Sequence, residues 1–577
     1  MELQIWMGRA GAGKSRRVLE TMQERRQRPQ ILLVPEHASH EAELDLCRAL
    51  GPTASRDAEV LSFRNLATRV LAQTGGLADV TLDAGGKLLT MRRALQEVSS
   101  RLTVFARPSQ RPAFLRQLVA LADELYAYQV TPEMLLAQVA DMEGAAGDKL
   151  RSAALIYGAY DAHLRGEGFD ARSRVQKLCD ALPESDYLMG KDVYVDGFSY
   201  FNRVEEDILE TALRQGNCLT VTLLGDESDP QLFQNALRQR DRLKRMAALV
   251  HARCEVETLV SKNDGPLGYL ERCFFDGEEP WQGEEPPIRL YQAETAFSEA
   301  EYVSACVRRL ARQGCRWRDI GVAARNMEVY GPLLEAVFRR DGIPAYISRR
   351  SDILEKPVLT MVLSAVDAVT GGFEYEDVFR CLKTGMAGIS AAECDMLENY
   401  VIRWQIRGGM WLKEADWTAD PDGYGQEISE ARRQRLEEVN AVRRRVRVLF
   451  LELSEGLKAG KTIRDKAEIL YRFTEHAGVP ETLKDQTATL YDGGQVQLAE
   501  EYSQLWSIFC GVLDQFVELL GDVEVDGQEF ARLLRLVLSQ YAVATIPATL
   551  DQVKVTPITR NDRHTVRHLF LLGANDN

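Results

Sequence analysis

The chain contains, at residues 8–15, the stretch Gly8-Arg9-Ala10-Gly11-Ala12-Gly13-Lys14-Ser15, which has the spacing G-x-x-x-x-G-K-[ST] of a phosphate-binding loop. An apolar, strand-like run at 3–7 precedes it, and a helix-like run without Pro or Gly at 14–27 follows it. Glycines let the backbone turn so that its N–H groups and the helix N-terminus point at an anion. The stretch predicts a nucleoside triphosphate site with Lys14 on the β and γ phosphates and Ser15 on Mg²⁺. A chance Gly-rich turn before Lys-Ser is the competing interpretation.

The bulk composition is that of a soluble globular protein. Its 577 residues are enough for three or four globular units, and 45% of them are hydrophobic and 27% charged. We find no run of about 18 apolar residues and no basic segment followed by an apolar one at the N-terminus, so we expect a cytoplasmic protein outside membranes. The ten cysteines are scattered without a C-x-x-C pair, which favours reduced thiols over disulfides or a cysteine metal site.

The net charge of −15 argues against a protein that coats nucleic acid through bulk electrostatics. A local basic channel is still compatible with it. Three basic clusters are candidates, and each has acidic neighbours in helical surroundings, so a solvated helix face is the favoured interpretation of each: Arg16, Arg17, Arg25, Arg26 and Arg28; Arg238, Arg240, Arg242, Lys244 and Arg245; Arg432, Arg433, Arg435, Arg443, Arg444, Arg445 and Arg447.

The order of apolar and amphipathic segments predicts an α/β fold in which the same plan occurs twice. An uninterrupted apolar run typical of a buried parallel strand lies at 31–34. Further strand candidates lie at 193–195, 219–224, 288–291, 320–324, 551–555 and 569–572. Charged helical sequence separates them, and an acidic segment rich in Pro and Gly looks like a linker. We expect a first α/β core at 1–80 and 190–275 with a helical insertion at 81–189, a linker at 276–287, and a second core at 288–386 and 546–577 with a helical insertion at 387–545.

A triphosphate site also needs an acidic residue at the end of a neighbouring strand to position Mg²⁺. Asp196, which follows the apolar run Val193-Tyr194-Val195, is the candidate. The next residue is Gly197, whereas helicase motors usually have a Glu there that orients the attacking water. Glu205 or Glu206 would be the substitutes, although surface glutamates are the competing interpretation.

A succession of motifs along the chain resembles the AddB family, the B subunits of bacterial AddAB helicase-nucleases, and more broadly the UvrD-like superfamily 1 helicases. These motifs are the loop at 8–15, Leu33-Val34-Pro35-Glu36, Leu61-Ser62-Phe63, Tyr194-Val195-Asp196-Gly197-Phe198, Asp319-Ile320-Gly321-Val322-Ala323-Ala324-Arg325-Asn326 and Leu572-Gly573-Ala574-Asn575-Asp576. The resemblance implies two RecA-like P-loop NTPase cores, with the second one incomplete at the C-terminal end of this chain.

The resemblance also implies partners and a role. The partner is an AddA-type subunit in a heterodimer, the substrate is a double-stranded DNA end processed for recombinational repair, and AddB scans single-stranded DNA for a Chi sequence that this chain does not reveal. By match to the family's motifs, the residues facing the single strand are Pro35, Glu36, His37, Ser62 and Phe63. An aromatic such as Phe63 can stack on a base, and a core aromatic at a strand end is its competing interpretation.

AddB proteins have a degenerate helicase fold, and together with Gly197 this predicts ATP binding with weak or absent hydrolysis. The family's nuclease domain and iron–sulfur cysteines follow the region at 572–576, so we expect an N-terminal fragment without a nuclease site, the cluster belonging to the full-length parent only. Three alternatives remain open: an active superfamily 1 helicase, a non-catalytic scaffold for AddA, and, least favoured, a small-molecule P-loop kinase.

Overall fold

The structure is a computed structural model, and it describes residues 1–51, 54–75, 82–102, 104–105, 112–140, 142–166, 174–261, 265–273, 280–284, 287–347, 351–423, 429–543, 551–559 and 566–575. Asp576 and parts of the expected linker, 276–279 and 285–286, lie outside these residues.

The first sheet has six strands in the order β3-β2-β4-β5-β1-β6, and all of its pairs are parallel. β1 and β2 follow each other in the chain but are not neighbours in the sheet, because β4 and β5 lie between them. The carboxyl ends of all six strands therefore form one edge, the edge where α/β proteins bind ligands. The strands are β1 (Glu2–Gly8), β2 (Gln30–Leu33), β3 (Ala58–Leu61), β4 (Asp192–Val195), β5 (Cys218–Leu224) and β6 (Arg253–Thr258).

Helices cover both faces of this sheet. Alternate residues of β1 point to opposite sides: Ile5 belongs to one buried apolar cluster and Trp6 to the other. The cluster around Ile5 contains side chains of α4 (Phe63–Thr74), α9 (Arg174–Ala181), α10 (Arg203–Gln215) and α11 (Gln234–Leu249). The cluster around Trp6 contains side chains of α1 (Lys14–Glu24), α2 (Ser39–Leu50) and α3 (Ala54–Asp57).

The second sheet has four parallel strands in the order β12-β7-β11-β8. They are β7 (Ile320–Ala324), β8 (Ala345–Ile347), β11 (Val553–Pro557) and β12 (His568–Leu572), and they pack against α13 (Ala296–Arg312) and α14 (Met327–Arg340). The strand expected at 288–291 is wrong: these residues have no regular structure. They are exposed, and the ring of Tyr291 stacks on Tyr302 of α13 at 3.6 Å instead of joining the sheet.

Two groups of helices, one inserted between β3 and β4 and the other between β8 and β11, share one apolar core. Arg92 of α5 pairs with Glu529 of α22 at 2.9 Å across this contact. The first group is α5 (Ala84–Val98), α6 (Pro112–Ala127), α7 (Pro132–Val139) and α8 (Gly144–Gly166). The second group is α15 (Pro357–Gly371), α16 (Tyr375–Leu382), α17 (Ala391–Trp404), α18 (Glu430–Ala459), α19 (Ile463–His476), α20 (Val479–Asp492), α21 (Val496–Leu520) and α22 (Gly527–Leu538), with a two-stranded ribbon of β9 (Ser351–Asp352) and β10 (Ala542–Val543).

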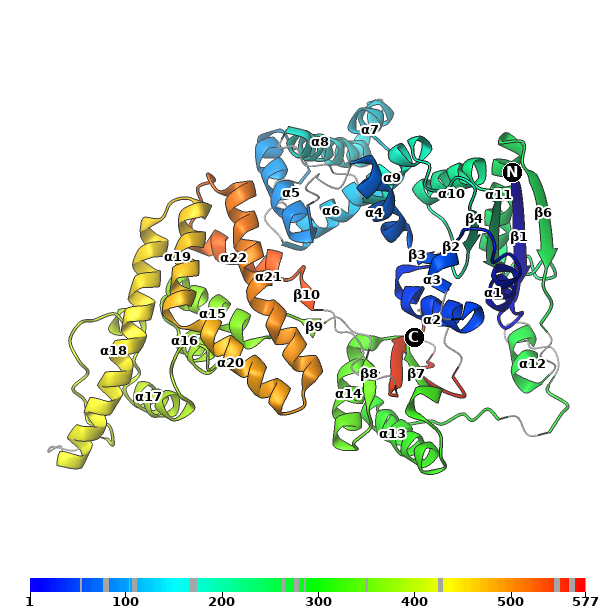
Figure 1. Ribbon diagram of the computed structural model, residues 1–577. Helices are drawn as coiled ribbons and strands as arrows, with labels where there is room; N and C mark the ends of the chain where they lie inside the picture. Colours follow the sequence, from blue (N-terminus) through cyan, green and yellow to red (C-terminus); the bar gives the residue numbers. More distant parts are fainter. Residues whose placement is uncertain are drawn as a thin grey trace.

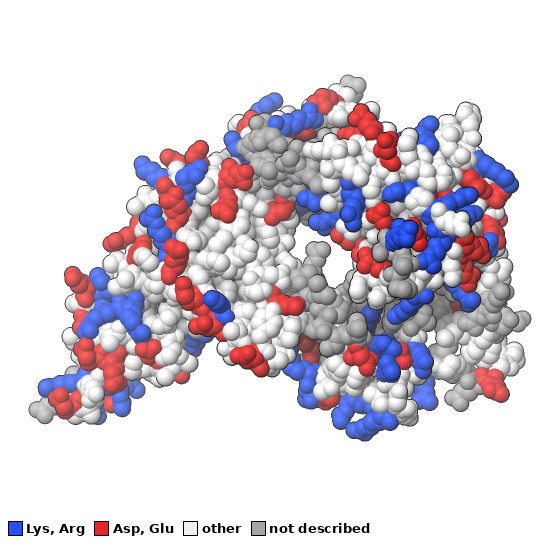
Figure 2. Space-filling model, in the orientation of Figure 1, with Lys and Arg blue, Asp and Glu red and all other residues white. Residues whose placement is uncertain are grey.

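Figure 1 shows the two α/β parts next to each other. The helical part, made of the two groups, lies above them with α5–α8 and to their left with α15–α22. Lys554 of β11 forms an ion pair with Glu41 of α2, so the two α/β parts touch directly. Figure 2 shows an opening between the helical part and the α/β parts. Among the described residues, we find no helix with the length and apolar character needed to span a bilayer.

Candidate functional site

The glycine-rich loop lies between the carboxyl end of β1 and the first turn of α1. Gly11 and Gly13 have φ angles of +74° and +84°, the left-handed region that favours glycine. A Cβ at Gly8 would lie 2.8 Å from the carbonyl oxygen of Leu259, so this position also excludes a side chain. The backbone that the loop adopts thus favours glycine at the two pattern positions, Gly8 and Gly13, and also at Gly11.

Lys14 points back across the loop. Its Nζ donates hydrogen bonds to the carbonyl oxygens of Gly8 (2.7 Å) and Arg9 (2.8 Å). Burial lowers the pKa of the Lys14 ammonium, and the carboxylates of Asp196 and Glu271 oppose this shift. The loop therefore holds a partly desolvated positive charge at the carboxyl edge of the sheet.

Asp196 follows β4 at the same edge and is only 2% exposed. Thr222 of β5, the neighbouring strand, donates a 2.5 Å hydrogen bond from its hydroxyl to Oδ1 of Asp196. Since β5 also pairs with β1, the fold brings Asp196 and Lys14 to one place. Ser15 is half-buried in the first turn of α1. Within the described residues, no group of three or more His, Cys, Asp or Glu side chains could hold a metal ion by itself.

Gly197 directly after Asp196 has a φ of +85°, and a Cβ there would lie 3.5 Å from Cδ of Pro35. The backbone thus favours glycine where a motor has Glu. The two substitute carboxylates are engaged elsewhere: Glu205 accepts a hydrogen bond from the backbone N–H of Asn202 in a helix capping box, and Glu206 accepts from Gln239 and Arg242. Both glutamates therefore serve α10 and its neighbours in this conformation.

Arg9 makes contacts in the loop that the sequence did not predict. Its guanidinium pairs with Asp226 at 2.7 Å and lies 3.9 Å from both Asp229 and Glu271, with the ring of Phe233 at 5.2 Å. These partners come from the segment that leads into α11 and from α12 (Pro266–Cys273), and the first of them is 217 residues along the chain. Only the folded sheet, which places β1 beside β5 and β6, brings them to the loop.

Pro35, Glu36 and His37 follow β2 at this same carboxyl edge, next to Asp196, whose N–H donates to the carbonyl oxygen of Leu33. Glu36 and His37 are exposed, and Arg64 pairs with Glu36 at 3.3 Å. These side chains are therefore accessible to a strand that crosses the edge.

Ser62 and Phe63 are placed differently. The hydroxyl of Ser62 accepts a hydrogen bond from the N–H of Asn65 and caps α4. Phe63 is 5% exposed, and its ring packs edge-on against Phe198 with 5.3 Å between centroids. In this conformation the ring of Phe63 is not exposed for the expected base stacking, because it fills the core between α4 and the loop after β4.

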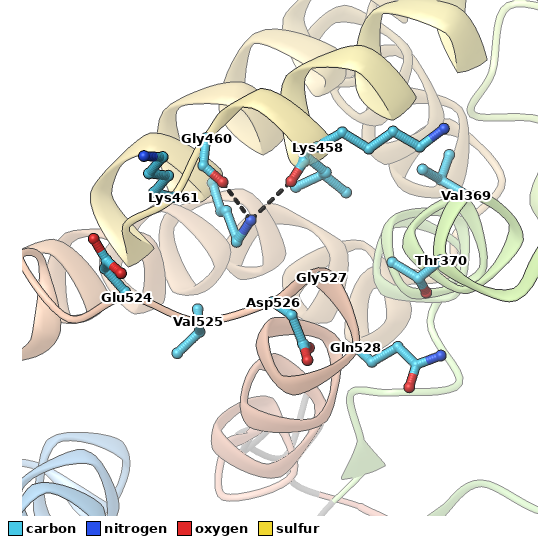
Figure 3. Close-up of a pocket in the computed structure, with 12 residues that line it drawn as sticks. Val369, Thr370, Lys458, Gly460, Lys461, Glu524, Val525, Asp526, Gly527 and Gln528 are labelled. Carbon is cyan, nitrogen blue, oxygen red and sulfur yellow. Dashed lines mark hydrogen bonds between the residues drawn. The ribbon is translucent and has the colours of Figure 1, made fainter.

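A separate hollow of about 710 Å³ lies in the helical part, at the ends of α15 and α18 and the start of α22. Lys466 is 2% exposed and donates to the carbonyl oxygens of Leu457 (2.8 Å) and Gly460 (2.6 Å), the two hydrogen bonds that are dashed in Figure 3. Lys466 thereby caps the carboxyl end of α18, and burial lowers its pKa. This hollow is a feature of helix packing and holds none of the site residues predicted from the sequence.

The fold and the loop define an α/β protein with parallel sheets that carries a G-x-x-x-x-G-K-[ST] loop between its first strand and helix. Residues 5–270 match the family model described as ADDB, N-terminal. The chain is 31% identical over 602 residues to a relative from Caldanaerobacter subterraneus subsp. tengcongensis, named as the B subunit of an ATP-dependent helicase/deoxyribonuclease. The match covers 100% of this chain and 51% of the relative.

Other relatives with the same name align over the same extent. The proteins of Acetivibrio thermocellus and Clostridium botulinum strain Langeland are 31% and 29% identical, each over 100% of this chain and 52% of the relative. The N-terminal part of the chain thus matches the AddB family model, and the whole chain spans about half the length of the curated relatives it matches.

Proposed function

We propose that this chain is the ATP-binding, strand-scanning part of an AddB-type protein, with weak or no ATP hydrolysis. One observation carries the proposal: Lys14 and the buried Asp196 meet at the carboxyl edge of the sheet, while Gly197 after Asp196 occupies a backbone conformation that favours glycine. The groups that hold a triphosphate are present, and the carboxylate that would orient water is absent from its usual position.

The loop residues Gly8 to Ser15 would hold ATP through backbone N–H groups, with Lys14 exchanging its carbonyl partners for phosphate oxygens. The donor set of the Ser15 hydroxyl and the Asp196 carboxylate suits Mg²⁺, which prefers hard oxygen ligands. When bound, Mg²⁺ would neutralise charge on the β and γ phosphates. Thr222 would orient Asp196 by its hydrogen bond.

The relatives are each named as one subunit of an ATP-dependent helicase/deoxyribonuclease. This name supports the proposal that the chain works in a two-subunit complex with an AddA-type partner. We propose that this complex processes double-stranded DNA breaks for recombinational repair in the cytoplasm. In it, two RecA-like cores of this chain would pass the single strand over the carboxyl edge at Pro35, Glu36 and His37. The search for Chi would take place there.

Nucleotide titration tests this function. A fluorescent ATP analogue with Mg²⁺ should bind the chain and lose at least about tenfold in affinity in Lys14→Ala, since a phosphate contact by a charged donor is removed. Phosphate release should stay close to that of Lys14→Ala with or without single-stranded DNA. Fast DNA-stimulated turnover would establish an active helicase instead. Failure to bind both nucleotide and single-stranded DNA at low salt would establish a scaffold.

A further inference from the structure

The exposed face of α11 carries a row of basic side chains. Arg238, Arg242 and Arg245 follow each other at i, i+4 and i+7, so they form one stripe along the helix. Arg242 pairs with Glu206 at 3.2 Å, and Arg240 pairs with Asp241 and Glu227. In the part of the chain that the structure describes, Arg238, Lys244 and Arg245 take part in no ion pair. The sequence cluster at 238–245 is therefore not a uniformly neutralised helix face.

The stripe borders a groove of about 1140 Å³ between α10, α11 and the end of α6. Three carboxylates also line this groove, and each has its own cation: Glu206 has Arg242, Asp207 has Arg203 at 3.1 Å, and Glu210 has Arg214 at 2.7 Å. The three carboxylates that line the groove are thus already paired with arginines. The charge left over along the groove is positive, which is complementary to a phosphate backbone.

Two exposed aromatic rings line the same groove. Tyr200 is 71% exposed and Tyr128 is 63% exposed, far above what tyrosines in a packed interior show. Tyr200 lies four residues after Asp196, in a loop that is fixed on both sides of it because Phe198 and Phe201 pack together at 5.3 Å. The loop therefore holds the Tyr200 ring out toward solvent from a rigid base.

We infer that this groove, together with the adjoining hollow that Lys244 lines beside Arg238 and Arg245, is a second contact surface for single-stranded DNA. Arg238, Lys244 and Arg245 hold phosphates there, and Tyr200 and Tyr128 stack on bases. Exposed aromatics beside unmatched cations are the combination that binds single strands without sequence readout. The inference rests on the proposed function, and it goes beyond it by assigning strand contacts outside the edge at Pro35, Glu36 and His37. The loop from Asp196 to Tyr200 connects this groove to the nucleotide site.

The test is anisotropy of a labelled oligo-dT strand with the full chain, across about 50 to 200 mM salt. Arg238→Gln/Lys244→Gln/Arg245→Gln should weaken binding by at least about tenfold and flatten the plot of log affinity against log salt by about 2, since single strands give roughly 0.7 per phosphate contact. The matched control, Arg433→Gln/Arg435→Gln/Arg444→Gln on α18, removes equal charge from exposed arginines that have carboxylate partners. It should keep the parent's affinity and slope.

Tyr200→Ala should weaken binding roughly five- to 150-fold, and Tyr200→Phe should restore it, because stacking needs the ring and not the hydroxyl. Equal affinity and slope in the triple variant and the parent would overturn the groove while leaving the proposed function intact. A loss for a duplex of the same length without a loss for oligo-dT would also overturn it. If the parent binds no single strand at low salt, the groove and the scanning part of the proposed function fail together.

Discussion

Thr222 and Asp196 form a buried hydrogen bond of 2.5 Å between adjacent strands at the carboxyl edge of the first sheet. The threonine hydroxyl thus donates directly to the acidic residue of the candidate site. Thr222→Val keeps the side chain's shape and removes this donor. We expect a loss of roughly 1–3 kcal/mol in stability, typical of a hydrogen bond to a charged group.

The same variant should bind the ATP analogue several-fold more weakly with Mg²⁺ and almost normally without it, because only the orientation of Asp196 changes. Thr222→Ser keeps the hydroxyl and should behave like the parent. Mg²⁺-dependent titrations of the three proteins measure this. An unchanged Mg²⁺ effect in Thr222→Val would show that Asp196 does not position the ion.

The affinity for ATP should depend on pH through Lys14. Burial lowers the pKa of this ammonium, so in the free protein it loses its proton at a lower pH than an ordinary lysine, which titrates near about 10.4. Binding phosphate needs the charged form. Affinity should therefore hold below the lowered pKa and fall as the pH rises through it, at a pH below about 10.4. Lys14→Arg stays charged and should give a flat profile, and an equally steep fall in Lys14→Arg would assign the effect to another group.

Local patterns in the sequence were enough to predict the first strand, loop and helix and the acidic residue after β4. Each of these is fixed by neighbours in the chain: β1 ends at Gly8, α1 begins at Lys14 and Asp196 follows β4. The position of Arg9 among Asp226, Asp229 and Glu271 follows only from strand order, which no local pattern encodes.

The other differences have the same origin. The run at 288–291 has strand-like residues but pairs with no strand among the described residues, which its local pattern does not reveal. The shared core of the two helical groups depends on contacts such as Arg92 to Glu529, which are 437 residues apart. The burial of Phe63 depends on Phe198, a residue of another strand's loop.

Substitutions of Phe63 test whether its ring serves the core or stacks on DNA. Phe63→Leu keeps apolar volume in the core, so we expect single-stranded DNA affinity within about twofold of the parent. Phe63→Ala leaves a cavity and should cost about 3–5 kcal/mol in stability. Anisotropy with oligo-dT and thermal unfolding measure the two effects. A tenfold loss of affinity in a well-folded Phe63→Leu would mean that the ring leaves the core to stack on a base.

Lys466 should hold the end of α18 in place. Lys466→Met removes the donor to Leu457 and Gly460 and leaves a buried and a half-buried carbonyl group without it, at a cost of about 1–3 kcal/mol. Since burial lowers the pKa of Lys466 in the folded state, the unfolded chain binds this proton more tightly. The parent's stability should therefore rise with pH between the lowered pKa and about 10.4, and Lys466→Met should lack this rise.

Hydrogen exchange of the amides at the end of α18 and the start of α19 measures the Lys466 effect locally. Lys461→Met is the control: Lys461 is exposed in the turn between α18 and α19, and its variant should stay within about 0.5 kcal/mol of the parent. Equal exchange rates in the two variants would contradict the capping role.

Variants at Gly197 distinguish two explanations of weak ATP hydrolysis, the lack of a carboxylate at this position and its left-handed backbone. Gly197→Glu restores the residue that helicase motors have after the acidic one, but it forces a side chain onto a φ of +85° at a cost of about 1–2 kcal/mol. We expect no gain in DNA-stimulated phosphate release, because relaxing this strain would shift the backbone that follows Asp196 beside Pro35. Gly197→Ala carries the same strain without a carboxylate, so the two variants should lose equal stability and show equal, low turnover. If Gly197→Glu alone hydrolysed ATP rapidly, the absence of one carboxylate would be sufficient to explain a silent site, and the left-handed turn would be incidental.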